Sequence, residues 1–444
     1  MARLSSLRAS IVHLRQRQGL RRILSNSGWM MGEQVLRLLV GVGMSAWTAR
    51  VLGPSQFGEL SYAIAFATVF GIVTTLGLNR ILVREMVAVA AQPDRVQGLM
   101  NTAFAMRLAA AAVVYALCLL AAWFSSERQF LLIALVAGGY FFSAADCVDL
   151  YFQARVQART TARARLVSFA GVTLVRVVLL LADASLPAFA AVVLLEYAGA
   201  ALALHWAYRH RGPGFGQTRP DWKLARQLLS ESWPEVIAGF SGLLFMRMDQ
   251  IMLQHLAGAE AVGTFAVAAR LSEAWYFIPS AIIASTFPNI VASRAVNPAQ
   301  YLRRLQLLMA GLCALAYAAV LSAMALGEPV IQLLYGSAYQ ASASILLVHI
   351  WCGLFVSLGL ASGSWIMAER RVSLNLYRNL AGLGANLVLN LALIPRFGAL
   401  GAAYATLMAL VVAYMLFDAF VPSMKAVSRS KWKALLVLPA LVRR

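Results

Sequence analysis

Residues 374–420 read LNLYRNLAGLGANLVLNLALIPRFGALGAAYATLMALVVAYMLFDAF, two long apolar runs separated by Pro395 and Arg396. A helix needs about 20 consecutive apolar residues to cross a bilayer. The runs 374–395 and 397–420 are each long enough, so this stretch predicts two membrane-spanning helices joined by a tight turn. The same hydropathy pattern predicts further spans at 27–48, 58–79, 99–124, 130–152, 163–184, 186–208, 228–254, 262–288, 303–326 and 342–367.

The composition excludes a water-soluble domain. Hydrophobic residues make up 61% of the 444 residues and charged residues 13%, against about 45–50% and about 25% in soluble proteins. The formal net charge of +20 lies in short basic clusters between the apolar runs, which indicates membrane topology and not a nucleic-acid partner. The four cysteines lie inside apolar runs without metal-ligand spacing, so no disulfide framework, metal or other cofactor is expected.

The positions of lysine and arginine predict the orientation of the chain. With the N-terminus in the cytoplasm, nearly every basic cluster is cytoplasmic, and only Arg50, Arg128 and Arg396 lie outside. This asymmetry is the positive-inside pattern. We therefore expect a multi-pass protein of the bacterial inner (cytoplasmic) membrane with both ends in the cytoplasm. The arginine-rich first residues contain no long apolar core, which favours a basic surface segment over a cleaved signal peptide.

Two sequence halves repeat weakly. The segment 51–63 resembles 255–268 with one residue inserted, and 151–166 resembles 365–380. Because six predicted spans form each half, the repeats have the same orientation, and their pseudo-two-fold axis is expected to run along the membrane normal. We predict an all-α fold of two six-helix lobes around a central cavity. The expected parts are a basic N-terminal segment at 1–26, an N-lobe at 27–208, a cytoplasmic linker at 209–226, a C-lobe at 227–420 and a basic tail at 421–444.

A set of short motifs accompanies the spans in a fixed order. They include Leu52-Gly53-Pro54 with Phe57-Gly58, Leu76-Gly77-Leu78 with Val83-Arg84-Glu85, Arg247-Met248-Asp249-Gln250, Ala269-Arg270-Leu271-Ser272-Glu273 and Phe397-Gly398-Ala399. Taken together, the set resembles the polysaccharide (Wzx-type, O-antigen) flippase family of the multidrug/oligosaccharidyl-lipid/polysaccharide exporter superfamily. The resemblance covers nearly the whole chain.

The resemblance implies a function. It implies a flippase, and not an enzyme, that moves an undecaprenyl-diphosphate-linked oligosaccharide from the cytoplasmic to the periplasmic leaflet. The cargo would be an O-antigen or exopolysaccharide repeat unit, moved by alternating access and coupled to an ion gradient. Implied partners are the lipid-linked oligosaccharide and membrane lipids, with a polysaccharide polymerase and glycosyltransferases as further candidates.

Charges inside the predicted spans are the candidate site residues. A charge at the bilayer centre costs at least about 2.5–3.5 kcal/mol, so it normally faces a partner or a wet cavity. Arginine offers a fork of donors that suits a diphosphate. The candidate cargo-binding arginines are Arg37, Arg107, Arg176, Arg247, Arg270 and Arg378. For Arg378, close to the cytoplasmic end of its span, snorkelling to the surface is the alternative.

Acidic and amide side chains complete the candidate set. Candidate ion-coupling groups or charge partners are Glu33, Asp146, Glu196, Asp249 and Glu273, and Asn386 with Asn390 form a polar stripe. The spacing or depth of the residues pairs Glu33 with Arg37, Glu196 with Arg176, and Glu273 with Arg270. A purely structural role, as ion pairs or hydrogen bonds between helices, remains open for each of them.

Three alternatives to the flippase stand beside it. A cation-coupled multidrug exporter of the same superfamily would favour a more acidic or aromatic cavity. A peptidoglycan-precursor flippase would be expected to have two further C-terminal helices. A membrane-bound polysaccharide polymerase or ligase would carry a large outer loop with catalytic groups, and the predicted outer connections are all short.

Overall fold

The computed structural model describes the backbone of residues 2–124, 126–212, 214, 219–294, 297–371 and 373–436, and the same side chains except those of 2–31, 298 and 299. Within these ranges all regular structure is helical and no strand occurs, which confirms the predicted all-α class. The side chains of the N-terminal arginines, part of the linker at 209–226 and the end of the tail at 421–444 lie outside the described residues.

Internal contacts group the chain into two compact units, and each unit draws on both sequence halves. Unit 1 comprises Met1–Gly41 and Phe70–Val236, and unit 2 comprises Val42–Val69 and Ile237–Arg444. Residues 42–69 of the first sequence half thus pack with the second half, and the first residues of the second half, up to Val236, pack with the first half. The lobes at 27–208 and 227–420 stay predictions.

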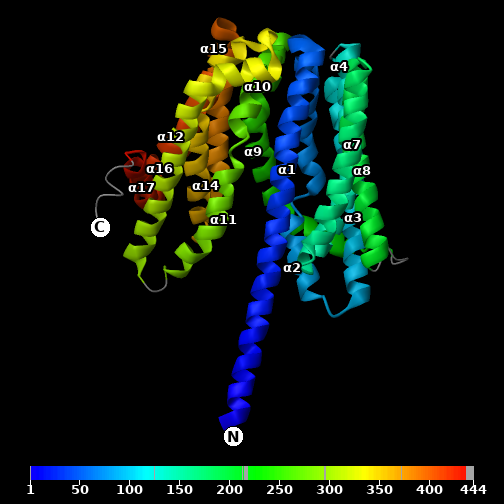
Figure 1. The fold of residues 1–444 in the computed structure, drawn as a ribbon, viewed down its shortest axis with the longest axis vertical. Coiled ribbons are helices and arrows are strands. Elements are labelled where there is room, and N and C mark those ends of the chain that lie inside the picture. Colours follow the sequence, from blue (N-terminus) through cyan, green and yellow to red (C-terminus); the bar gives the residue numbers. More distant parts are fainter. Residues whose placement is uncertain are drawn as a thin grey trace. The chain divides into compact units, whose positions relative to one another are not determined.

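Unit 1 consists of helices joined by short turns. It contains both ends of α1 (Ala2–Gly71) and the start of α9 (Trp222–Leu256). Between them lie η1 (Ile72–Thr75), α2 (Asn79–Ala88), α3 (Pro93–Ala122), α4 (Glu127–Gly138), α5 (Tyr140–Ser143), η2 (Ala144–Asp146), α6 (Cys147–Ala154), α7 (Ala158–Leu181) and α8 (Leu186–Arg211). Figure 1 shows α7 and α8 side by side as a hairpin. A proline in the first turn of α3 and of α8 suits the helix start because that position needs no backbone donor.

Unit 2 contains the middle of α1 and most of α9. Its other helices are α10 (Ala259–Glu273), α11 (Phe277–Ala292), α12 (Pro298–Tyr335), η3 (Ser337–Tyr339), α13 (Ala341–His349), α14 (Cys352–Ala368), α15 (Ser373–Val411), the π-helix η4 (Val412–Leu416), α16 (Phe417–Phe420), η5 (Pro422–Met424) and α17 (Lys425–Leu435). The long α12 packs against α14 and against the C-terminal α17.

The described residues contain ten candidate membrane spans, two of which are too long for one crossing. Gly32–Ala88 has 57 residues and Ser373–Phe420 has 48, so each would be about 70–85 Å long as one straight helix, against a hydrocarbon core of about 30 Å. Each is broken by a glycine in the left-handed region, Gly53 at φ 71° and Gly398 at φ 55°. Counting two crossings for each of these gives twelve, as the sequence predicts.

Backbone geometry supports the internal repeat. Left-handed residues recur at matching places: Gly53 (φ 71°) and Gly258 (φ 85°) differ by 205 positions, and Val156 (φ 57°) and Arg370 (φ 58°) by 214. Each pair lies in the turns that the sequence aligns. Non-glycine residues seldom adopt a positive φ, so this agreement indicates that the two halves share one backbone path.

Within unit 2 the first pair of aligned turns pack directly against each other. A Cβ atom on Gly58 would lie 1.7 Å from the carbonyl oxygen of Ala259, and one on Gly263 would lie 2.1 Å from that of Pro54. The contact is reciprocal, because Ala259 follows Pro54 by the same 205 positions that separate Gly263 from Gly58. Only glycine allows backbones to approach so closely.

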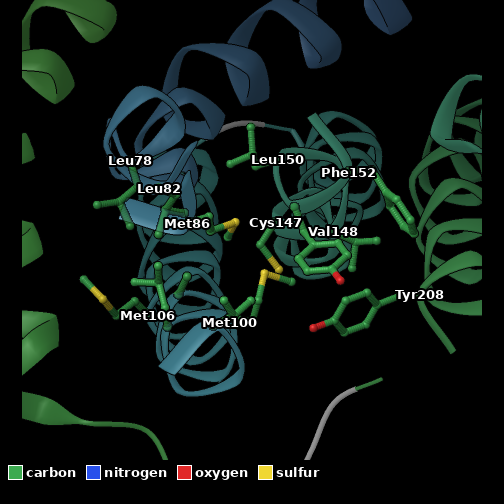
Figure 2. Close-up of a cluster of buried hydrophobic side chains, with 14 of the residues drawn as sticks. Leu78, Leu82, Met86, Met100, Met106, Cys147, Val148, Leu150, Phe152 and Tyr208 are labelled. Carbon is green, nitrogen blue, oxygen red and sulfur yellow. The ribbon is translucent and has the colours of Figure 1, made fainter. Parts of the chain in front are cut away.

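The core of unit 1 joins both sequence halves. Figure 2 shows Leu82 and Met86 of α2 facing Met100 and Met106 of α3, with Tyr208 of α8 at the other side. The first turns of α9 add Ala225 and Leu228 to the same cluster. Van der Waals packing of these side chains joins α9 to α2 and α3 at this end.

Candidate functional site

A buried carboxylate on α9 is surrounded by neutral donors from α15. Asp249 is 2% exposed. Its Oδ1 accepts hydrogen bonds from Nδ2 of Asn386 at 2.9 Å and of Asn390 at 2.7 Å, and its Oδ2 accepts one from Oγ1 of Thr406 at 2.6 Å. Asn390 also donates to Oδ1 of Asn386 at 3.0 Å. Three of the predicted candidates are thus brought together at one place.

The Asp249 cluster, defined as Asp249, Asn386, Asn390 and Thr406, contains no compensating cation. Among the described residues no arginine, lysine or histidine forms an ion pair with Asp249. The Oδ1 atom of Asn390 is buried without a hydrogen-bond partner. An unpaired buried carboxylate is costly as an anion, so it favours taking up a proton or a small cation. Carboxylate, amide and hydroxyl oxygens are the ligands that hard cations prefer.

Thr406 is the member of this cluster that the sequence does not single out. It follows Ala405 in the last long apolar run, and its hydroxyl also lies 2.9 Å from the carbonyl oxygen of Ala402, as for any helical threonine. The contacts of Asp249 join positions 137, 141 and 157 residues apart. Only the meeting of α9 with both halves of the kinked α15 reveals them.

A cationic group lies on α9 and α10. Arg247 forms an ion pair with Glu273 at 3.7 Å, and both side chains are partly exposed. Arg270 donates to Oγ of Ser45 in α1 and lies within electrostatic reach of Glu273. The sequence pairs Glu273 with Arg270, whereas its ion pair in the structure is with Arg247. Two guanidinium groups thus lie close to one carboxylate, and their forked donors suit an anionic ligand.

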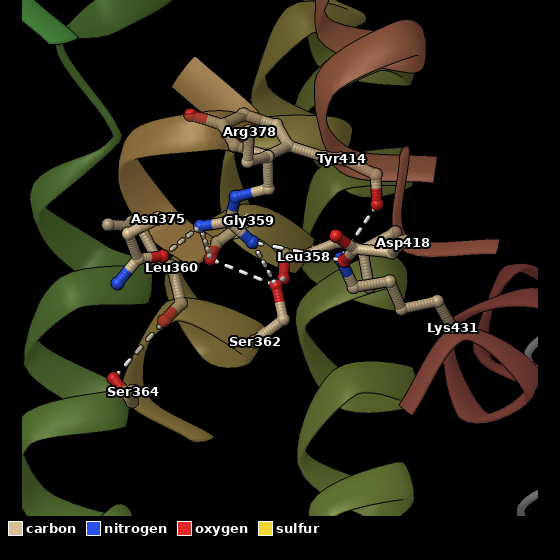
Figure 3. A network of polar contacts seen from close by, with 10 residues as sticks. All are labelled: Leu358, Gly359, Leu360, Ser362, Ser364, Asn375, Arg378, Tyr414, Asp418 and Lys431. Carbon is tan, nitrogen blue, oxygen red and sulfur yellow. Dashed lines mark hydrogen bonds and ion pairs between the residues drawn. The ribbon is translucent and has the colours of Figure 1, made fainter. Parts of the chain in front are cut away.

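Arg378 occupies a different setting from that group. It is 4% exposed, and its Nη1 donates to Oγ of Ser362 and its Nη2 to Oδ1 of Asn375, both at 2.8 Å (Figure 3). The guanidinium also lies over the ring of Tyr414, 4.7 Å from its centroid. Arg378 therefore lies inside unit 2 and does not snorkel to the surface. These partners occupy both Nη atoms, whereas Nε has no hydrogen-bond partner, and the enclosure by protein favours a structural role.

The network around Arg378 continues to two charges that the sequence does not single out. Asp418 lies 3.8 Å from Arg378 and binds the ammonium of Lys431, which also donates to the carbonyl oxygen of Tyr414 at 2.7 Å (Figure 3). Burial lowers the pKa of Lys431 to about 8, so it is mainly charged at neutral pH. The sequence places Lys431 among exposed tail charges, whereas both its side chain and that of Asp418 are buried.

In unit 1 the predicted charges form separate pairs. Two suggested pairs are confirmed: Arg176 binds Glu196 at 2.6 Å, and Arg37 binds Glu33 at 3.2 Å. Asp146 and its neighbour Asp149 both form ion pairs with Arg165, each at 3.1 Å, and Arg165 lies outside the candidate set. Whether any of these charges contacts cargo stays a prediction.

Arg107 is a buried charge in unit 1, and no carboxylate of the described residues forms an ion pair with it. It is 2% exposed, its Nη2 donates to Oδ1 of Asn79 at 2.6 Å, and its Nε has no hydrogen-bond partner. Asp146 lies within electrostatic reach. A buried guanidinium with a spare donor is chemically suited to an anion.

One ion pair outside the candidate set links α2 to α9. Arg84 binds both carboxylate oxygens of Glu231, at 2.6 and 2.8 Å, and also binds Glu85 at 2.8 Å. These side chains are exposed, so the pair contributes at most about 1 kcal/mol.

The fold defines a polytopic, all-helical membrane protein with polar clusters buried between its helices. The structure resembles an inward-facing MATE-family multidrug resistance transporter of the MOP superfamily, with a TM-score of 0.67 at 11% identity over 88% of this chain and 95% of that chain. It also resembles lipid II flippase MurJ in an inward closed conformation, with a TM-score of 0.64 at 12% identity over 94% and 92%. At these identities the likeness concerns the fold, and it confirms two six-helix lobes.

The family follows from the sequence. Residues 23–294 match the family described as "Polysaccharide biosynthesis protein", which is more than half of the chain, and the protein belongs to that family. It is also similar to two proteins of Haloferax volcanii. "Probable flippase AglR" is 29% identical over 177 residues, 38% of this chain and 36% of that protein. "Probable low-salt glycan biosynthesis flippase Agl15" is 22% identical over 195 residues, 44% and 41%. The matched region spans about two fifths of each relative.

Proposed function

We propose that this protein is a flippase for a lipid-linked oligosaccharide. The observation that carries the proposal is the family match over 23–294, because this family belongs to polysaccharide biosynthesis. Two relatives named as flippases and a fold shared with MurJ support movement of cargo across the bilayer in preference to an enzymatic role. As the specific cargo we propose an undecaprenyl-diphosphate-linked O-antigen or exopolysaccharide repeat unit.

The cationic group on α9 and α10 is proposed to hold the diphosphate. Arg247 pairs with Glu273 and Arg270 lies within electrostatic reach of the same carboxylate, so two guanidinium groups stand close together and offer the forked donors that suit a diphosphate. Arg107 is a further candidate because its Nε has no partner. The proposed roles of Arg37 and Arg176 are weaker, since each already binds a glutamate, and Arg378 is enclosed by protein.

The Asp249 cluster is proposed to couple transport to an ion gradient. A proton or small cation at Asp249 would neutralise its charge and hold α9 against both halves of α15. Loss of that ion would leave a buried anion, which favours a different arrangement of these helices. The cargo would then be carried by alternating access from the cytoplasmic to the periplasmic leaflet of the inner membrane, with both chain ends in the cytoplasm.

A cation-coupled multidrug exporter is the second candidate, favoured by the likeness to the MATE fold. One experiment separates the two. We expect expression in a flippase-null strain to restore surface glycan, and Arg270→Ala to abolish that rescue while the protein still inserts. Arg128→Ala, which changes an arginine that the sequence places in an outer turn, is the matched control. Drug resistance without glycan display would overturn the proposed flippase function. Full rescue by Arg270→Ala would overturn the proposed cationic site for the diphosphate.

A further inference from the structure

The C-terminal helix α17 has two chemically different faces. One face is buried against unit 2 and contains Val427, Lys431 and Ala434. The opposite face is exposed along the whole helix and carries Lys425, Arg429, Trp432, Lys433 and Leu436. The spacings of four, three, one and three residues place these five side chains on one side of a helix.

The buried face fixes how α17 is oriented. Lys431 reaches the carbonyl oxygen of Tyr414 in the π-helix η4 and the carboxylate of Asp418. A π-helix shifts the hydrogen-bond register of the backbone, which frees a carbonyl for another donor. Farther along, Oη of Tyr317 in α12 donates to the carbonyl oxygen of Leu435 at 2.9 Å. The exposed face is therefore held outward.

The exposed face carries positive charge that the chain leaves uncompensated. In the part of the chain that the structure describes, no carboxylate forms an ion pair with Lys425, Arg429 or Lys433. Trp432 stands between these cations with 48% of its surface exposed. Lysine and arginine around an amphipathic ring are typical of the boundary between head groups and acyl chains.

The position of α17 along the chain places it near that boundary. The last candidate membrane span ends at Phe420, and α17 begins at Lys425 after the short η5. Few residues separate the span from the helix, so α17 cannot lie far from the end of the hydrocarbon region. An acidic protein segment would supply charge to the three cations but no apolar layer for Trp432 and Leu436.

We propose that the exposed face of α17, made by Lys425, Arg429, Trp432 and Lys433, binds the head groups of anionic phospholipids. The cations contact the phosphates, and Trp432 lies at the level of the glycerol backbone. Each cation near such a surface strengthens the association by about fivefold. The buried anchor at Lys431 connects this lipid contact to Asp418 and Arg378.

Trp432 itself can report the lipid neighbours of the full-length protein. The protein is placed in nanodiscs of phosphatidylcholine and phosphatidylglycerol, with either the phosphatidylglycerol or an equal amount of phosphatidylcholine brominated. The Trp432 signal is the wild-type fluorescence minus that of Trp432→Phe. We expect brominated phosphatidylglycerol to quench this signal at least about threefold more strongly at low salt, with the preference falling at high salt.

Two triple variants decide the outcome. Lys425→Gln/Arg429→Gln/Lys433→Gln, measured with and without Trp432→Phe, should lose the preference. The control Arg219→Gln/Lys223→Gln/Arg226→Gln removes three exposed cations before and within the first turns of α9 and should keep it. Equal quenching by both lipids in the wild type, or a preference that survives the first triple variant, would overturn the proposal. Equal quenching together with lost glycan display in that variant would indicate an acidic protein partner instead.

Discussion

Unit 2 buries two carboxylates, and they differ in the charge of their partners. Asp249 accepts hydrogen bonds from two amides and a hydroxyl. Asp418 binds the ammonium of Lys431 and lies 3.8 Å from the guanidinium of Arg378. The negative charge of Asp418 is therefore compensated inside the chain, whereas Asp249 has no cation among its described partners. In the proposed mechanism this missing cation, and not burial alone, distinguishes Asp249 as the coupling group.

Neutralising Asp249 should have the largest effect on transport. Asp249→Asn keeps the size of the side chain but removes the only charged ligand. One hydrogen bond to a charged group contributes about 1.5–3 kcal/mol, which is roughly 10- to 150-fold in affinity, and we expect the loss of the charge itself to lower ion affinity by more than that. Glycan display in a flippase-null strain should drop to background. The thermal midpoint of the purified variant should stay the same or rise, because a costly buried anion is gone.

The same substitution at Asp418 is the sharpest control for that prediction. Asp418→Asn would leave Lys431 and Arg378 buried without a counter-charge, so its thermal midpoint should fall. If Asp249→Asn destabilises as much as Asp418→Asn does, or if it transports normally, the contrast between the two carboxylates is wrong.

Removing Lys431 should have the largest effect on stability. Lys431→Met leaves Asp418 with only the more distant Arg378 and detaches α17 from the carbonyl of Tyr414. Breaking a buried ion pair from one side costs about 3–5 kcal/mol, which thermal unfolding in detergent would detect. The double variant Asp418→Asn/Lys431→Met should recover part of that loss, because no unpaired carboxylate remains. A double variant less stable than the single one would contradict this account.

Removing the hydroxyl of Thr406 should have the smallest effect. Thr406→Val preserves the shape of the side chain and deletes one donor to Asp249. The free-energy loss of about 1.5–3 kcal/mol corresponds to a roughly tenfold or greater change in the affinity of the coupling ion. The dependence of glycan display on the ion gradient should therefore shift when display is measured at several gradients. Thr264→Val, whose hydroxyl bonds to backbone carbonyls one turn before it in α10, should leave the gradient dependence unchanged.

Hydropathy predicts the twelve crossings because lipid imposes the same apolar length on every span. It cannot place the breaks at Gly53 and Gly398 to the residue, since each turn takes only a few residues and leaves no long polar stretch in the sequence. The candidates Asp249, Asn386 and Asn390 are recognisable because polar groups are rare inside spans.

The contact of Asp249 with Asn386 and Asn390 depends on tertiary packing, which the spacing of residues along the sequence does not reveal. Periodicity relates residues of one helix, whereas Asn386 meets Asp249 across 137 positions. Lys431 shows the opposite error: a lysine beyond the last span is normally exposed, and only the partners Asp418 and Tyr414 explain why this one is buried. Pairs within one helix or one hairpin, such as Glu33 with Arg37, are the contacts that sequence spacing does predict.

The reciprocal contact of Gly58 and Gly263 has a consequence for how the chain arose. In a symmetric homodimer, residue i of one subunit contacts residue j of the other, and residue j of the first contacts residue i of the second. The contacts of Gly58 and Gly263 follow this pattern. Here both copies are covalently joined, so the two turns form in one chain the interface that two half-length chains would share. A side chain added at either glycine would strike a carbonyl oxygen. If the two halves arose by gene duplication, this interface requires glycine to be kept at both equivalent positions, 58 and 263.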